Sequence, residues 1–384
     1  MKKICFMALV VIFVTSLFMG GCSEPTPSPA PVPSPAPSPP PELAAPEPIK
    51  IIHTIHLPPP PAPPAVAIEA VQMENAWIAN EIDKRTEGRV QIELAWGAPF
   101  GPPTEFLSMV GRPGVADSAM VVLAYHKREL PLTSTTCLPF IAPDMDVQGM
   151  ATAQLYKEWA PLREEWEPYN VTPLFWFSCP QASLVCREPV RTLEDFKGLT
   201  LFGSSFSAAT EKLLGATPVS MPAGEAYDAI AKGTLDGAWF PHSGSIVFKY
   251  YEHANYITDL GFFGGAFINP WSVNTDVWNS IPQADQEAIM SIEPEVNVKF
   301  GEFLAATYEK IFDEFGAAGL EFLSLPDEDI AEMKEIVVEN LWTDWLDEME
   351  EMGVVDGREC LERYQALVER YTSQAAVMPP WPSE

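Results

Sequence analysis

The amino-acid sequence predicts an α/β protein with two lobes, a hinge and a long connecting helix. Strand-like apolar runs alternate with stretches of helical periodicity, and this alternation starts again near residue 170. Strands that alternate with helices need crossover connections, which favour a largely parallel sheet. Beyond Pro282 apolar residues recur at helical spacing through about Phe315, which predicts one long helix with a bend at Pro294. A length of 384 residues, 47% of them hydrophobic, is enough for two cores.

The first 21 residues have the features of a signal peptide. They contain two lysines, an apolar run too short to span a bilayer, and small residues before Cys22. The stretch Met19-Gly20-Gly21-Cys22 resembles the lipobox of bacterial lipoproteins, which predicts that Cys22 carries lipid; the alternative is an ordinary secretory signal cut nearby. Residues 22–48 are mostly Pro, Ser and Ala, a composition that favours an extended tether between a membrane anchor and a folded domain.

The first lobe is expected over residues 49–172, with about 266–307 returning to it. The sequence GRVQIELAW alternates apolar and polar residues up to Trp96, as a half-buried strand does. The apolar positions of the preceding helix are expected on one side, and they are Val71, Ala76, Ile78 and Ile82. In chain order, the elements are a strand over 49–56, a helix over 66–85, a strand over 88–96, a helix over 104–110 and a strand over 117–123.

The second lobe is expected over residues 173–265 and about 308–335, followed by C-terminal helices over 336–384. Its helix over 223–232 stops at Gly233, a residue suited to a left-handed C-cap. The stretch 266–275 is expected to form a strand that returns toward the first lobe. In chain order, the other elements are strands within 170–178, 183–190 and 198–203, a helix over 207–214, and strands within 217–221 and 235–240.

Composition and motifs argue against several function classes. The net charge of −30 argues against a nucleic-acid partner, because an acidic surface repels phosphate groups. The sequence has no phosphate-binding glycine loop, dinucleotide fingerprint, zinc-protease motif or nucleophile elbow, so we expect neither an enzyme nor a cofactor. His53 and His56 would point to opposite faces of a strand, which argues against a joint metal site.

Four cysteines lie beyond the N-terminal region, and none has the spacing of a zinc knuckle or a redox pair. Cys179 and Cys186 flank six residues between two strand-like runs, so a hairpin could bring them opposite each other outside the reducing cytosol. A disulfide between them and two free thiols stay open as alternatives. Cys137 and Cys360 are expected to be buried thiols.

Five stretches of the chain resemble, in order and spacing, the solute-binding proteins of tripartite ATP-independent periplasmic (TRAP) transporters. The stretches are IANEIDKRTEGRVQIELAWGAPFGPPTEFLSMV, LPF at 138–140, TLEDFKGLTL, LGATPVSMPAGEAYDAIAKGTLDG and SVNTDVWNSIPQADQEAI. The resemblance covers nearly everything after residue 49. It implies a two-lobed clamp of the periplasmic-binding-protein type outside the cytoplasm. Such a protein closes over one small molecule, usually an organic acid, and hands it to membrane permease subunits.

The departures from this family predict the kind of ligand. Members usually carry an arginine just after the KGLKI-like strand, where it pairs with the substrate carboxylate; here that position is Phe202. The asparagine common after the DG pair falls at Phe240, beside Trp239. A second basic position falls at Ala182, although Arg187 is close enough to serve. We expect an aromatic cleft and a ligand less acidic and more apolar or aromatic than the family norm. Further candidate contacts are Trp176, Tyr125 and Asn274.

The leading hypothesis is a lipid-anchored, extracytoplasmic receptor for a TRAP-type transporter. A receptor of the same fold that reports its ligand to a sensor is the nearest alternative. Two alternatives come from other classes, namely a secreted hydrolase that uses His242 and Ser243, and a zinc-binding lipoprotein. Turnover of an ester would favour the hydrolase. A zinc titration without heat or a thermal shift would exclude the zinc-binding lipoprotein.

Overall fold

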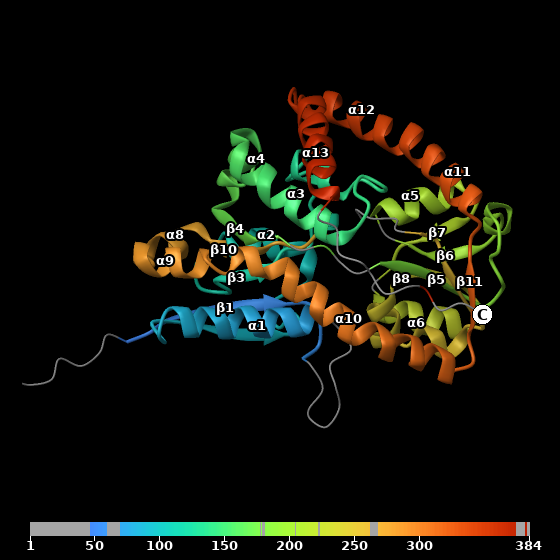
Figure 1. Cartoon of the computed structure of the whole chain (residues 1–384), viewed down its shortest axis with the longest axis horizontal. Coiled ribbons are helices and arrows are strands. Elements are labelled where there is room, and N and C mark those ends of the chain that lie inside the picture. The colour runs from blue at the N-terminus through green and yellow to red at the C-terminus, as the bar shows by residue number, and fades with distance from the viewer. Residues whose placement is uncertain are drawn as a thin grey trace, which may run out of the picture. The chain divides into compact units, whose positions relative to one another are not determined.

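The computed structural model describes residues 47–59, 70–176, 178, 181–203, 205–221, 223–261, 268–373 and 381 (Figure 1). The signal peptide, Cys22 and most of the proline-rich tether lie outside these described residues, as does Cys179. In the part of the chain that is described, no helix has both the length and the apolar character needed to cross a membrane. The folded unit that begins at Pro46 is built on two β-sheets.

The first sheet consists of β1 (Ile49–Ile55), β2 (Val90–Trp96), β3 (Ser118–Met120), β4 (Val171–Phe175) and β10 (Trp271–Asn274). The strands lie in the order β2-β1-β3-β10-β4. β1 is parallel to β2 and β3, whereas β10 is antiparallel to β3 and β4. The parallel crossovers and the return of a late strand to this sheet confirm the expectations from the sequence.

Helix α1 (Ala70–Arg85) makes the crossover between β1 and β2 and buries Ile78 and Ile82 in the core of the first sheet. Ala76 is exposed, so the predicted apolar side of this helix was wrong at that position. The reason is geometric, because residues two apart on a helix do not share a face, whereas residues four apart do. The side chain of Val71 lies outside the description.

The second sheet consists of β5 (Ala182–Cys186), β6 (Thr200–Phe202), β7 (Thr217–Val219), β8 (Gly237–Pro241), β9 (Tyr256–Asp259) and β11 (Glu321–Ser324). The strands lie in the order β11-β9-β5-β8-β6-β7, with β5 antiparallel to its neighbours. Helices α5 (Ser205–Leu213) and α6 (Ala223–Ala231) follow β6 and β7. Gly233 has a φ of 71°, as expected for a left-handed C-cap after α6.

The long helix expected beyond Pro282 is two helices, α9 (Gln283–Met290) and α10 (Glu293–Ala317). Pro294 lies in the first turn of α10. A proline lacks the backbone N–H that interior helical positions need, but the first turn has no partner for that group. Pro294 therefore begins a helix where the sequence suggested a bend.

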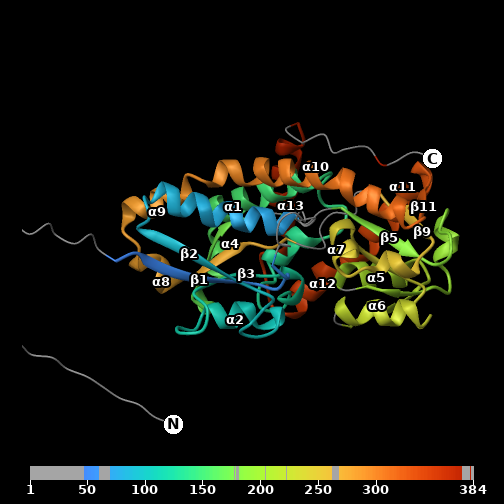
Figure 2. The same ribbon diagram turned by 90° about the horizontal axis from the view of Figure 1, so that it is seen from below.

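Helix α10 contributes to the cores of both sheets. Four residues in its first part, Val296, Phe300, Leu304 and Tyr308, join the cluster beneath the first sheet. Ile311 and Phe315, in its last part, join a cluster of the second sheet. Figure 2 shows α10 beside α1 at one end and near the second sheet at the other. One rigid element thus links the two sheets.

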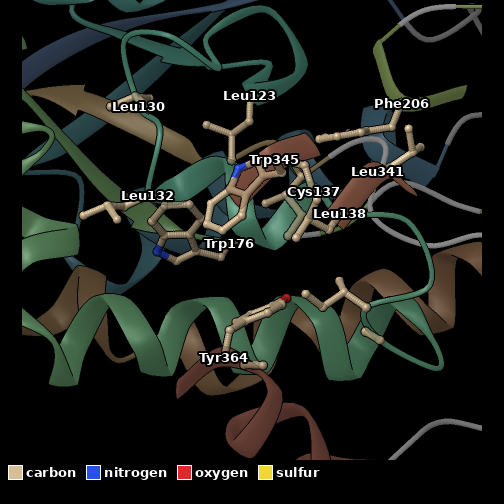
Figure 3. Close-up of a cluster of buried hydrophobic side chains, with 14 of the residues drawn as sticks. Leu123, Leu130, Leu132, Cys137, Leu138, Trp176, Phe206, Leu341, Trp345 and Tyr364 are labelled. Carbon is tan, nitrogen blue, oxygen red and sulfur yellow. The ribbon is translucent and has the colours of Figure 1, made fainter. Parts of the chain in front are cut away.

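The C-terminal helices also contact both parts of the fold. Helix α11 (Asp327–Val337) packs against α5, and α13 (Gly357–Thr372) packs against α3 (Met145–Glu158). Figure 3 shows side chains from these regions in one cluster, with Phe206 of α5 near Trp345 and Leu341. The remaining elements are α2 (Phe106–Val110), α4 (Ala160–Glu164), α7 (His242–Val247), α8 (Thr275–Ser280), α12 (Thr343–Glu351), the π-helical turn Val338–Trp342, and 3₁₀ turns at Pro103–Glu105, Leu123–Tyr125, Thr133–Cys137, Glu167–Tyr169, Leu193–Phe196 and Tyr250–His253.

Candidate functional site

The candidate site lies at the end of the second sheet where strands β6 and β8 have their carboxyl ends, which we call the candidate edge. β6 and β8 are parallel, so their carboxyl ends meet at the same edge. β5 begins at this edge, where Ala182 pairs with Pro241. The chain that arrives from β4 of the first sheet therefore enters the second sheet here. Ligands of open α/β sheets bind outside the carboxyl ends of the strands, which makes this edge the expected binding face.

Phe202 and Phe240 lie together near this edge. Their rings are 5.6 Å apart, and both contact Tyr250, at 6.0 Å and 5.7 Å. The pairing of Phe202 with Ala238 explains this, because Phe240 is two residues further along β8 and therefore on the same face. Phe202 is buried and Phe240 is half-buried. That this pair contacts a ligand stays a prediction.

Trp239 lies on the opposite face of the second sheet. It is only 2% exposed and belongs to a different cluster from Phe202 and Phe240. Its ring is 6.1 Å from that of Phe196. Neighbouring residues of a strand point to opposite faces, so Trp239 and Phe240 do not form one continuous aromatic wall. The structure thus brings two of these three predicted residues together and separates the third.

Arg187 was predicted as an alternative base for the ligand, and the structure puts it at the wrong end of β5. Its backbone N–H donates to the carbonyl oxygen of Asp236, which precedes β8. Five paired residues separate this position from Pro241, or about 17 Å along the strands. The guanidinium is exposed and lies near Gly233. A shifted hairpin does not bring it to the carboxyl ends.

Asn274 was predicted as a ligand contact, but its side chain has a structural role. Its Oδ1 caps helix α8 by accepting hydrogen bonds from the backbone N–H groups of Asp276 and Val277, at 2.9 and 3.1 Å. Its Nδ2 donates to the carbonyl oxygen of Val110 at 2.8 Å. These bonds hold the amide at the helix N-cap, a common position for asparagine.

The two other predicted contacts follow strands of the first sheet, although Trp176 falls within the range expected for the second lobe. Trp176 directly follows β4 and is buried between Tyr156 and Trp166, with ring distances of 5.4 and 5.8 Å. Tyr125 lies on the turn after β3 and is 48% exposed. Trp176 is therefore held by the core, whereas Tyr125 is free to contact a solute.

His242 is a buried polar residue at the candidate edge, directly after β8. It is 1% exposed, its ring contacts Tyr308, Phe312 and Trp381, and burial lowers its pKa to about 3. Neither ring nitrogen has a hydrogen-bond partner among the described residues, and the same holds for the Oγ of Ser243. A serine nucleophile is activated through a hydrogen bond to its base, and the described residues show no such bond between Ser243 and His242.

Glu211 of α5 is the residue at this edge that the sequence did not predict. Its side chain is completely buried, and neither carboxylate oxygen has a partner in the described structure. A methyl group placed on Gly203, which follows β6, would lie 2.4 Å from both oxygens. The carboxylate therefore lies against the backbone at the end of β6. Burial raises the pKa of Glu211 from 4.5 to about 8.

The first lobe contains a second acid of this kind. Glu74 of α1 is completely buried, has no partner for either oxygen within the described ranges, and has its pKa raised by burial. Its neighbour Asn75 donates to the sulfur of Met120, at the carboxyl end of β3. No lysine or arginine is buried among the described residues. The described interior thus contains carboxyl groups without a partner and no buried lysine or arginine to pair with them.

His53 is buried and contacts neighbouring strands of the first sheet. Its Nδ1 is 2.6 Å from the Oγ of Ser118, and its ring centroid is 4.2 Å from that of Trp271. The described residues contain no group of three or more His, Cys, Asp or Glu side chains able to hold a metal ion.

Three cysteines are described, and all have buried, free thiols. This confirms the expectation for Cys137 and Cys360. The sulfur of Cys186 is 3.3 Å from the carbonyl oxygen of Asp236, so of the two alternatives the structure has the free thiol at Cys186. Cys179 lies outside the described residues.

Comparison with known proteins gives consistent matches. Residues 72–348 match the model of a family described as bacterial extracellular solute-binding protein, family 7. A solute-binding protein of Albidiferax ferrireducens is 24% identical over 279 residues, which cover 70% of this chain and 79% of that protein.

Two solved structures are similar in fold. A TRAP periplasmic solute-binding protein from Desulfovibrio salexigens has a TM-score of 0.72 at 25% identity, and the match covers 85% of this chain and 98% of that one. A TRAP solute-binding protein from Rhodoferax ferrireducens, in complex with copurified benzoate, has a TM-score of 0.74 at 20% identity, over 85% of this chain and 100% of that one.

Proposed function

Because the family model covers most of the chain, this protein belongs to family 7 of the bacterial extracellular solute-binding proteins, and we propose that it captures a small organic solute for a TRAP-type permease. Its fold is that of extracytoplasmic transport receptors and not that of an enzyme. The observation that carries the proposal is the two-sheet architecture with a shared helix, α10, whose two ends belong to different cores. Such an element can act as the support about which two lobes close on a ligand.

We further propose that the ligand is less acidic and more apolar or aromatic than is usual in this family. Two features support this. Phe202 stands where the resemblance implies a carboxylate-binding arginine, and it packs with Phe240 at the candidate edge. In addition, none of the described lysines and arginines is buried.

We propose that Cys22 anchors the protein to the membrane through lipid and that the proline-rich segment after it acts as a spacer. The motivation is the lipobox-like sequence, followed by 26 residues rich in Pro, Ser and Ala before the first strand. Anchoring would keep the receptor near its permease, while the extended spacer leaves the folded part free to turn.

The proposed ligand class can be tested with a thermal-shift panel of neutral aromatics, aromatic amines, aromatic amides, aromatic acids and dicarboxylates. We expect aromatic solutes without a second carboxylate to raise the melting temperature of the protein. Phe240→Ala should weaken their binding by about 1.5–3 kcal/mol, the scale for losing a large aromatic contact. Phe100→Ala is the matched control, because Phe100 is 40% exposed.

A dicarboxylate that binds more tightly than every other solute in the panel would refute the ligand class and leave the receptor function intact. If no small organic solute stabilises the protein, the receptor function itself is contradicted.

A further inference from the structure

The side chain of Glu211 occupies a position where an isolated charge is costly. It extends from α5 to the backbone of Gly203, at the carboxyl end of β6, and no solvent reaches it. Removing a carboxylate from water without a partner costs several kcal/mol, and a protonated carboxyl group without an acceptor is also unfavourable. No described protein atom forms a hydrogen bond with either oxygen of Glu211, in the charged or in the protonated form.

Gly203 leaves room for this arrangement. A Cβ there would lie 2.4 Å from both oxygens, so the carboxylate of Glu211 would have to move. Because Gly203 has no side chain, the two oxygens of Glu211 can lie at the carboxyl end of β6, where α/β proteins bind ligands. An unpaired polar group that is held in place at a binding face is better explained by a ligand than by core packing.

We propose that the solute carries a protonated amine and that Glu211 binds it. This inference rests on the proposed receptor function and specifies the charge of the solute. An ammonium group supplies a permanent positive charge with N–H donors, and no lysine or arginine is buried among the described residues to supply one. Phe202 and Phe240 point to the other face of the second sheet, because Phe202 directly precedes Gly203 in the chain, so the inference concerns only the charged group of the solute.

Binding should release a proton. Burial raises the pKa of Glu211 to about 8, so at pH 7 the unliganded side chain is mostly protonated. When an ammonium ion binds, the carboxyl group loses its proton to the solvent and the resulting carboxylate pairs with the intact ammonium. Glu74 is a comparable buried acid on the first lobe, but the proposal does not need it to contact the same group.

The test uses three probes of similar shape and different charge, namely benzylamine, benzamide and benzoate. Each is titrated at pH 7 into the wild type, Glu211→Gln, and Glu188→Gln, whose glutamate is exposed near the end of β5. We expect benzylammonium to bind the wild type and the Glu188→Gln control equally, and Glu211→Gln at least ten-fold more weakly. Calorimetry in phosphate and in Tris buffer should detect release of up to one proton in the wild type and none in Glu211→Gln.

Two outcomes would overturn the inference. The first is binding of benzoate without binding of benzylammonium, which leaves the receptor function standing but shows that the cargo is an anion. The second is equal affinity of the wild type and Glu211→Gln for benzylammonium. If none of the probes binds, the wild type and Glu211→Gln do not differ in their affinity for benzylammonium, so the second outcome applies.

Discussion

Replacing Glu211 by glutamine should change how the stability of the unliganded protein depends on pH. The pKa of Glu211 is about 8 in the folded protein and 4.5 for an ordinary glutamate. Between these two values the folded state binds more protons than the unfolded state, so the free energy of unfolding falls as the pH rises. Glutamine has the same shape and does not titrate, so the variant should lack this contribution.

The magnitude follows from the two pKa values. Between pH 5 and pH 7 the buried acid should lower the stability of the wild type by about 2.5 kcal/mol relative to Glu211→Gln. Urea unfolding of both proteins and of Glu188→Gln, at pH 5, 6, 7 and 8, measures this difference. Parallel curves for the wild type and Glu211→Gln would refute the reasoning, because they would mean that Glu211 titrates normally and is therefore solvated or paired.

Three further predictions concern other parts of the molecule. Trp239→Ala should destabilise the unliganded protein by about 3–5 kcal/mol, because the indole is buried on the core face; unchanged stability with weaker solute binding would place Trp239 in the cleft. Wild-type protein should partition into the detergent phase and Cys22→Ser should not, whereas equal partitioning would exclude the lipid anchor. Adding a solute that binds should reduce the radius of gyration in small-angle scattering through hinge closure, and an unchanged radius would indicate a rigid site.

The order of strands and helices could be predicted because it depends on local patterns. The alternation in GRVQIELAW marks β2, and Gly233 marks the end of α6. The pattern could not place Pro294 correctly, since a proline fits the first turn of a new helix as well as a bend in a long one. The additional boundary between α9 and α10 therefore appeared only in the structure.

The candidate site could be predicted only in part. The resemblance located Phe202 and Phe240, but treating Trp239 as their neighbour in space overlooked the alternation of side chains along a strand. Arg187 and Asn274 were chosen by residue type, and their positions depend on strand register and helix capping. Glu211 resembles an ordinary glutamate of a helical surface, and its burial depends on the approach of α5 to Gly203. A glycine directly after β6 was the one available signal.

Native mass spectrometry of the purified protein tests the central claim, that this chain is a receptor for one small solute, most directly. The account predicts a species with one copurified small molecule per chain, which is lost on unfolding and identified as an aromatic or apolar solute. A second spectrum of Glu211→Gln, purified in the same way, should show much lower occupancy. A wild-type protein that carries no small molecule, and gains none when the organic solutes of the panel are added, would contradict the account.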